Sequence, residues 1–143
     1  MAGNKSTKVL IIDDNEDIRD VLRLFLEMSG YAVIAAADGV QGTRLAVSER
    51  PDICVLDVDM PHMDGYAVCN MLKAQPETQH IPVIFLSGAY LKKRDVVEGM
   101  YVGGEDYITK PVNQLELLNR IEAVMSRTRH AQDTAKPGVN TES

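Results

Sequence analysis

Carboxylates stand at the ends of two apolar runs in this sequence. Asp13 and Asp14 follow "VLII", and Asp57 and Asp59 lie at the end of "VLDVD". Three carboxylates held close together would repel one another and raise each other's pKa values. A hard divalent cation would remove that repulsion, and a few carboxylates with water suit Mg²⁺, or Mn²⁺ in its place. These acids are therefore candidate ligands of a divalent metal.

Two other polar residues follow apolar runs later in the chain. Ser87 ends "VIFLS", beside the small residues Gly88 and Ala89, and Lys110 precedes Pro111. A serine hydroxyl and a lysine ammonium group can each bind a phosphoryl oxygen. An aspartate can itself be the nucleophile and become an aspartyl phosphate. Phosphoryl transfer depends mainly on positioning and charge neutralisation, which these residue types can supply.

The elements that must position these residues alternate along the chain. Short apolar runs predict strands over residues 8–12, 31–36, 52–57, 81–87 and 105–109. Apolar residues three and four apart predict helices over residues 15–30, 39–50, 65–74, 92–103 and 113–128. Such alternation indicates parallel strands joined by helical crossovers, in a doubly wound α/β sandwich. Ligands of open parallel sheets bind beyond the carboxyl ends of the strands, where all the polar residues above fall.

Composition and charge limit the class of protein. The 143 residues are 45% hydrophobic and 25% charged, as in a soluble globular domain. A net charge of -6 argues against nucleic-acid binding by the domain itself. No apolar run approaches the ~20 residues of a membrane span, and two cysteines without CxxC spacing indicate reduced thiols. We therefore expect a cytoplasmic protein with one domain over residues 8–129 and flexible segments, or linkers, at 1–7 and 130–143.

Four segments, in this order, resemble the receiver domain of bacterial-type two-component response regulators. They are "IIDDNED", "VLDVDMPHMDG", "FLSGAY" and "GGEDYITKP". The resemblance implies a CheY-like (βα)5 flavodoxin-like fold with the sheet order 2-1-3-4-5. It also implies a phosphoprotein of a phosphorelay that assists only its own phosphorylation and dephosphorylation, and is not an enzyme acting on an external substrate.

The resemblance also implies a role for each acidic residue. Asp57 would be the phosphoacceptor. Asp13, Asp14 and Asp57 would hold Mg²⁺, together with the backbone carbonyl of Asp59.

It further implies roles for residues at the ends of the last two strands. Ser87 would bond the phosphoryl group and move with it, and Lys110 would pair with a phosphoryl oxygen. Tyr107 would be an aromatic switch that turns inward when Ser87 moves. The peptide between Lys110 and Pro111 would be cis.

The partners implied by the resemblance are proteins. A sensor histidine kinase or a histidine phosphotransfer protein would supply the phosphoryl group. The fourth helix, fifth strand and fifth helix would pass the signal to a downstream effector protein or a C-terminal effector domain. A homodimer formed on phosphorylation is a further possible output, and contact with nucleic acid or membrane is not expected.

Other interpretations stay open. Asn15 or Asp14 could cap the first helix, and Asp64 could cap the third. The "DVD" segment superficially resembles the DxD motif of haloacid-dehalogenase-type phosphohydrolases, so a small phosphatase with an aspartate nucleophile is one alternative. A pseudo-receiver, which binds partners without being phosphorylated, is the other, although no acid, lysine or acceptor is missing here.

Overall fold

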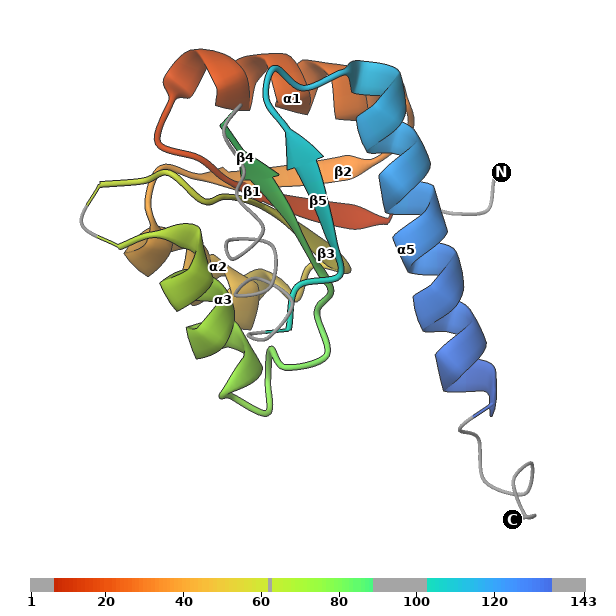
Figure 1. The fold of residues 1–143 in the computed structure, drawn as a ribbon. Coiled ribbons are helices and arrows are strands. Elements are labelled where there is room, and N and C mark those ends of the chain that lie inside the picture. The colour runs from red at the N-terminus through yellow and green to blue at the C-terminus, as the bar shows by residue number, and fades with distance from the viewer. Residues whose placement is uncertain (1–6, 62, 89–102, 135–143) are drawn as a thin grey trace.

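A five-stranded parallel sheet forms the centre of the protein. The computed structural model describes residues 7–61, 63–88 and 103–134. The strands are β1 (Lys8–Ile12), β2 (Ala32–Ala36), β3 (Ile53–Asp57), β4 (Val83–Ser87) and β5 (Asp106–Thr109). The helices are α1 (Glu16–Met28), α2 (Gly39–Glu49), α3 (Gly65–Lys73) and α5 (Gln114–Thr134). The strand order is β2-β1-β3-β4-β5, which confirms the predicted fold class and topology (Figure 1).

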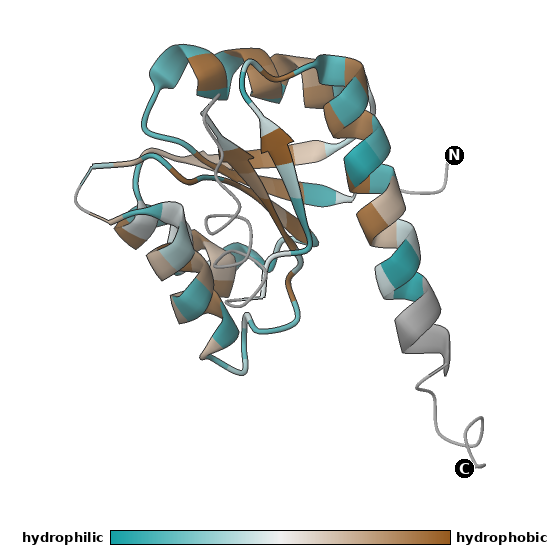
Figure 2. Ribbon diagram, in the orientation of Figure 1, coloured by the Kyte–Doolittle hydropathy of each residue, from teal (hydrophilic) through white to brown (hydrophobic). Residues whose placement is uncertain are grey.

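Helices cover both faces of this sheet. The pair α1 and α5 packs on one face, and the pair α2 and α3 packs on the other (Figure 1). Successive strand residues point to opposite faces, so Leu10 and Leu56 join the cluster under α2 and α3, while Ile11 and Val55 join the cluster under α1 and α5. Every residue of β3 and β4 is buried, and Figure 2 shows the strands as the most hydrophobic part of the chain. Burial on both faces explains why these strands read as continuous apolar runs.

Helix caps fix the chain directly after the loops that carry the acidic residues. The side chain of Asn15 accepts the Ile18 N–H at 3.0 Å at the start of α1. Asp64 accepts the Ala67 N–H at 2.9 Å at the start of α3. The capping interpretations of Asn15 and Asp64 are therefore confirmed. Gly30, with a positive φ of 98°, ends α1 as predicted.

The end of the last helix differs from the prediction. Helix α5 continues to Thr134, six residues beyond the expected end at residue 128, and includes residues 130–134 of the segment expected to be flexible. The sequence contains no glycine or proline between residue 126 and residue 134, so its backbone chemistry offers no reason for the helix to stop at 128. The domain boundary at residue 129 stays a prediction.

Two further observations complete the comparison of the elements. The helix expected over residues 92–103 lies outside the described residues, apart from Gly103, which adopts a φ of 105° before β5. Within the described parts of the chain, no helix is both long and apolar enough to cross a lipid bilayer. Both cysteines, Cys54 and Cys69, are buried in the cluster under α2 and α3, and burial raises the pKa of each thiol.

Candidate functional site

Three of the predicted metal ligands meet at the carboxyl edge of the sheet. Asp13 directly follows β1 and Asp57 is the last residue of the neighbouring strand β3. Oxygen atoms from the carboxylates of Asp13, Asp14 and Asp57 all lie within 4.8 Å of one another. Asp13 is fully buried, Asp57 is 1% exposed, and Asp14 is exposed to solvent. The edge of the sheet therefore holds two buried carboxylates with a third at the surface.

A single lysine reaches these acids from the other side. The Lys110 ammonium group donates a hydrogen bond to Asp57 Oδ1 at 2.9 Å and lies 3.8 Å from Asp13 Oδ2. The Lys110–Pro111 peptide is cis, and the Lys110 N–H donates to the Ser87 carbonyl at 2.6 Å. Lys110 is therefore fixed by its backbone to the end of β4 while its side chain crosses to β3.

Burial dominates the electrostatics of the two inner acids. Burial raises the pKa of Asp57 above its ordinary value, against the opposing effects of Lys110 and of the Asp59 N–H. Burial likewise raises the pKa of Asp13, and repulsion from Asp57 adds to it. Burial of Lys110 alone would lower its pKa, but the hydrogen bond and charge of Asp57 and the charge of Asp13 outweigh this effect and raise the pKa overall. One lysine thus compensates the charge of the carboxylates only in part.

The clearest sign of a missing ligand is a pair of unpaired oxygens. Asp13 Oδ1 accepts the Asn15 N–H at 2.9 Å, and Asp57 Oδ1 accepts from Lys110 and, at 3.2 Å, from the Asp59 N–H. The other oxygens, Asp13 Oδ2 and Asp57 Oδ2, are buried without a hydrogen-bond donor among the described residues. Buried polar atoms of this kind need an explanation, and an unmodelled ion is one of the usual ones. These hard oxygen donors fit a divalent cation.

Asp59 lies beside this cluster but not in it. Its side chain is exposed, and its Oδ2 accepts the Gly88 N–H at 3.1 Å. This contact joins the loop after β3 to the end of β4, next to Ser87. The resemblance assigned only the backbone carbonyl of Asp59 to the metal, and the position of its carboxylate is compatible with that assignment. Ala89 lies outside the described residues.

The remaining predicted residues line the neighbouring strands. Ser87 ends β4 with 7% of its surface exposed and pairs with Thr109 of β5. Tyr107 is half-buried on β5, and its ring centroid lies 5.1 Å from that of Phe85. The structure therefore places the serine, the lysine and the tyrosine on the β4–β5 side of Asp57, opposite Asp13.

Two residues of this region were missed by the sequence analysis. Arg19 of α1 donates a hydrogen bond to the Asp13 carbonyl at 2.8 Å, which fixes the turn after β1. Arg120 of α5 bonds Asp106 Oδ1 at 2.6 Å and the Tyr107 carbonyl at 3.2 Å, which ties α5 to β5. Their helical position was a weak signal, since any exposed helix face carries arginines.

The comparisons with known proteins agree with this geometry. The family model of the response regulator receiver domain matches residues 9–122. RpaA of Synechocystis, named a DNA-binding dual master transcriptional regulator, is 40% identical over 129 residues, covering 90% of this chain and 53% of RpaA. The chain spans about half the length of the curated relatives it matches.

Solved structures show the same fold. The chemotaxis protein CheY4 of Vibrio cholerae is 31% identical, with a TM-score of 0.79 over 83% of this chain and 98% of CheY4. The receiver domain of the sensor histidine kinase PA1611 of Pseudomonas aeruginosa is 29% identical, with a TM-score of 0.76 over 85% of this chain and 98% of that domain, and holds a magnesium ion in its active-site cleft. Since the family model covers most of the described sheet and helices, the chain belongs to the response regulator receiver domain family.

Proposed function

We propose that this domain is the phosphoacceptor of a two-component system and that Asp57 is the residue phosphorylated. The observation that carries the proposal is the buried carboxylate of Asp57, with one unpaired oxygen, between two further acids and Lys110. One oxygen of Asp57 would bond to the phosphorus while the bond from phosphorus to the donor's imidazole nitrogen breaks. The imidazole keeps the electron pair of that bond and takes up a proton.

The surrounding residues would divide the work of neutralising charge. Asp13, Asp14, Asp57 and the backbone carbonyl of Asp59 would hold Mg²⁺, or Mn²⁺, and PA1611 holds magnesium in its own cleft. The bound ion would neutralise charge on the phosphoryl group. Lys110, already 2.9 Å from Asp57, would bind a phosphoryl oxygen.

On the β4 side, Ser87 would donate its hydroxyl to the phosphoryl group and Tyr107 would respond to that movement. The added charge would bias the surface formed by β5, α5 and the segment at residues 92–103. Apart from assisting its own phosphorylation and dephosphorylation, the domain would have no enzymatic activity.

The phosphoryl donor would be a protein that docks beside Lys110. A groove of about 260 Å³ lies there between α1 and the chain that follows β5. It is lined by Asp17, Ile18, Val21, Leu22, Lys110, Pro111, Val112 and Gln114. Val21 is 52% exposed, so an apolar surface lies open next to the acceptor. A sensor histidine kinase or histidine phosphotransfer protein that covered it would bring its phosphohistidine to the edge that holds Asp57.

The output would be another protein or another domain. RpaA is about twice as long as this chain and is named as a transcriptional regulator, which favours control of an effector domain joined to residues 130–143. Helix α5 leads the chain away from the sheet in that direction (Figure 1). A separate effector protein, or a homodimer formed on phosphorylation, would use the same surface. With its net charge of -6, the receiver itself would act in the cytoplasm without contacting nucleic acid or membrane.

Phosphoryl incorporation from acetyl phosphate tests this function. Intact mass should show the gain of one phosphoryl group only when Mg²⁺ is present, with no gain in Asp57→Asn. The matched control is Asp20→Asn, which changes an exposed aspartate of α1 and should be phosphorylated like the wild type. No incorporation from acetyl phosphate or from a panel of histidine kinases would favour a pseudo-receiver. Continuous turnover of small phosphate esters would favour the phosphatase.

A further inference from the structure

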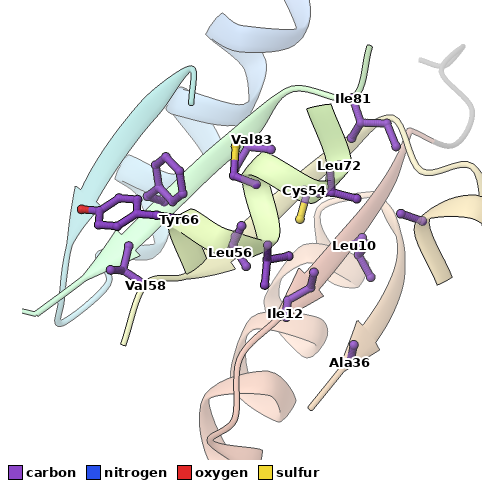
Figure 3. Close-up of a cluster of buried hydrophobic side chains, with 14 of the residues drawn as sticks. Leu10, Ile12, Ala36, Cys54, Leu56, Val58, Tyr66, Leu72, Ile81 and Val83 are labelled. Atoms are coloured by element: carbon purple, nitrogen blue, oxygen red, sulfur yellow. The ribbon is translucent and has the colours of Figure 1, made fainter. Parts of the chain in front are cut away.

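Tyr66 lies where the acceptor loop, β4 and β5 come together. It is the second residue of α3, is 8% exposed, and packs its ring against Phe85 with the centroids 5.2 Å apart. Its hydroxyl group is hydrogen-bonded to the hydroxyl group of Tyr107. Figure 3 shows the Tyr66 ring beside the other residues of the cluster, with its oxygen pointing away from the aliphatic side chains. A buried tyrosine hydroxyl needs such a partner, so the bond contributes to the position of both rings.

The backbone next to Tyr66 is packed directly on the acceptor loop. The Gly65 N–H donates to the Val58 carbonyl at 3.0 Å. A Cβ atom on Gly65 would lie 2.5 Å from the Asp57 carbonyl oxygen and 2.9 Å from Val58 Cα. The first turn of α3 and the Asp57–Val58 backbone are thus in contact without a side chain between them. A displacement of this loop must also displace Tyr66.

Tyr107 is placed to respond to Tyr66. It lies on the edge strand β5, pairs in register with Phe85, and is only half-buried. An edge strand leaves its outer side open, so the inward position of Tyr107 depends on the contacts that its ring and hydroxyl make with the core. Phe85 supplies the ring contact and Tyr66 supplies a hydroxyl contact.

We propose that Tyr66 is a positioning residue that holds Tyr107 against the core and couples its position to the acceptor loop. The coupling rests on the proposed function, because phosphorylation of Asp57 is the event that would shift the loop. The holding role does not depend on phosphorylation. The two parts can therefore fail separately.

Tyr66→Phe tests the holding role, because it removes the hydroxyl and keeps the ring against Phe85. The five tyrosines can be labelled as 3-fluorotyrosine and assigned by Tyr→Phe variants. Broadening of the Tyr107 ¹⁹F signal by a soluble paramagnetic agent then reports its exposure. We expect the ratio of outward to inward Tyr107 to rise about fivefold, the change that loss of one hydrogen bond gives. Tyr31→Phe removes a hydroxyl on the opposite face of the sheet and should leave Tyr107 unchanged. Unchanged Tyr107 broadening in folded Tyr66→Phe would overturn the proposal.

A double-mutant cycle gives a second readout that is independent of the label. Tyr66→Phe and Tyr107→Phe each remove the same hydrogen bond, so the urea midpoint of the double variant should lie close to that of the less stable single variant. Additive midpoint shifts would show that the two hydroxyls act independently, which would overturn the holding role.

The coupling is tested with acetyl phosphate and Mg²⁺ on the labelled proteins. Intact mass gives the extent of phosphorylation of Asp57, so wild type and Tyr66→Phe can be compared at equal extent. The change in the Tyr107 signal on phosphorylation should be at least halved in Tyr66→Phe. An equal change in both proteins would overturn the coupling. Absence of phosphorylation in both would overturn the proposed function, and with it the coupling, while the holding role is decided by the first two experiments.

Discussion

Asn in place of Asp13 should stabilise the metal-free protein and, at the same time, remove its stabilisation by Mg²⁺. The substitution keeps the shape of the side chain. Its Oδ1 can still accept the Asn15 N–H, now at 2.9 Å from Asp13 Oδ1. Its amide nitrogen takes the place of the unpaired Oδ2 and can donate to the carboxylate of Asp57. The substitution therefore removes a buried charge without leaving a cavity.

The size of the gain follows from three opposing effects on Asp13. Its repulsion from Asp57, at up to 4.8 Å, is about 3 kcal/mol at an effective dielectric constant of about 20. Its attraction to Lys110 at 3.8 Å is about 4 kcal/mol on the same basis, reduced because the lysine is 23% exposed. These two effects nearly cancel, which leaves the cost of removing a carboxylate from water. We expect Asp13→Asn to raise the free energy of unfolding by about 1–3 kcal/mol in EDTA at neutral pH.

Added Mg²⁺ should reverse the order of stability. A metal that binds only the folded state adds about 2.7 kcal/mol at one hundred times its Kd. If the loss of one carboxylate ligand raises the Kd about a hundredfold, the same Mg²⁺ concentration would add only about 0.4 kcal/mol to Asp13→Asn. The difference between the two gains is the effect of the ligand.

Urea unfolding followed by far-ultraviolet circular dichroism is the suitable assay, because the chain has no tryptophan. Wild type, Asp13→Asn and the exposed-site control Asp20→Asn should each be unfolded in EDTA and in Mg²⁺. The control should match the wild type in both conditions. A less stable Asp13→Asn in EDTA would refute the electrostatic reasoning. An equal gain from Mg²⁺ in wild type and Asp13→Asn would refute the role of Asp13 as a ligand.

Two other predictions follow from the same region. Gly65→Ala should lower the free energy of unfolding by about 1–3 kcal/mol, because its Cβ would lie 2.5 Å from the Asp57 carbonyl oxygen and 2.9 Å from Val58 Cα, and backbone atoms cannot rotate away; a change below about 0.5 kcal/mol in urea unfolding would contradict this packing. Since the pKa values of Asp13 and Asp57 are raised in the folded state, the folded protein binds more protons than the unfolded chain between the ordinary value of 3.8 and the raised values. The contribution of these two acids to stability in EDTA should therefore fall as pH rises through that window, so the urea midpoint of the wild type should fall relative to that of Asp57→Asn from about pH 4 to about pH 7. A midpoint difference that does not change with pH would count against raised pKa values.

The main features of the fold could be predicted because strand burial leaves a direct record in the sequence. The run at residues 8–12 forms β1 with the predicted bounds, and β3 and β4 are buried at every position, as continuous apolar runs indicate. The end of α5 could not be predicted in the same way. Apolar periodicity ends where the helix leaves the sheet, although the backbone stays helical to Thr134.

The site divides along similar lines. Asp13, Asp57 and Ser87 were predictable because polar residues after apolar strands fall at one edge of a parallel sheet. The bond of Asp59 to Gly88 and the contact of Tyr66 with Tyr107 join residues 29 and 41 positions apart. No local pattern marks such pairs, because they depend on how α3 and β5 pack once the sheet has formed.

The order of the strands explains why one aspartate can be the centre of the site. Strand β3 lies between β1 and β4, so Asp57 has Asp13 on one side and Ser87 on the other. Negative charge gathers on the β1 side, and the hydroxyl and ammonium groups gather on the side of β4 and β5. A phosphoryl group on Asp57 would lie across this boundary, with a cation held from the β1 side and Lys110 reaching from the β5 side.

This arrangement also limits how the β4–β5 side can respond. The Lys110 N–H is bonded to the Ser87 carbonyl at 2.6 Å, so the two residues that would contact the phosphoryl group are connected through their backbones. A movement of either residue toward Asp57 must therefore be shared by the end of β4 and the end of β5. Tyr107 lies three residues before Lys110 on the same strand and contacts Tyr66, whose helix packs on the acceptor loop. The acceptor thus meets β5 by two routes, through Lys110 and through Tyr66, and only the second can be cut by removing a single hydroxyl group while the phosphoryl contacts stay intact.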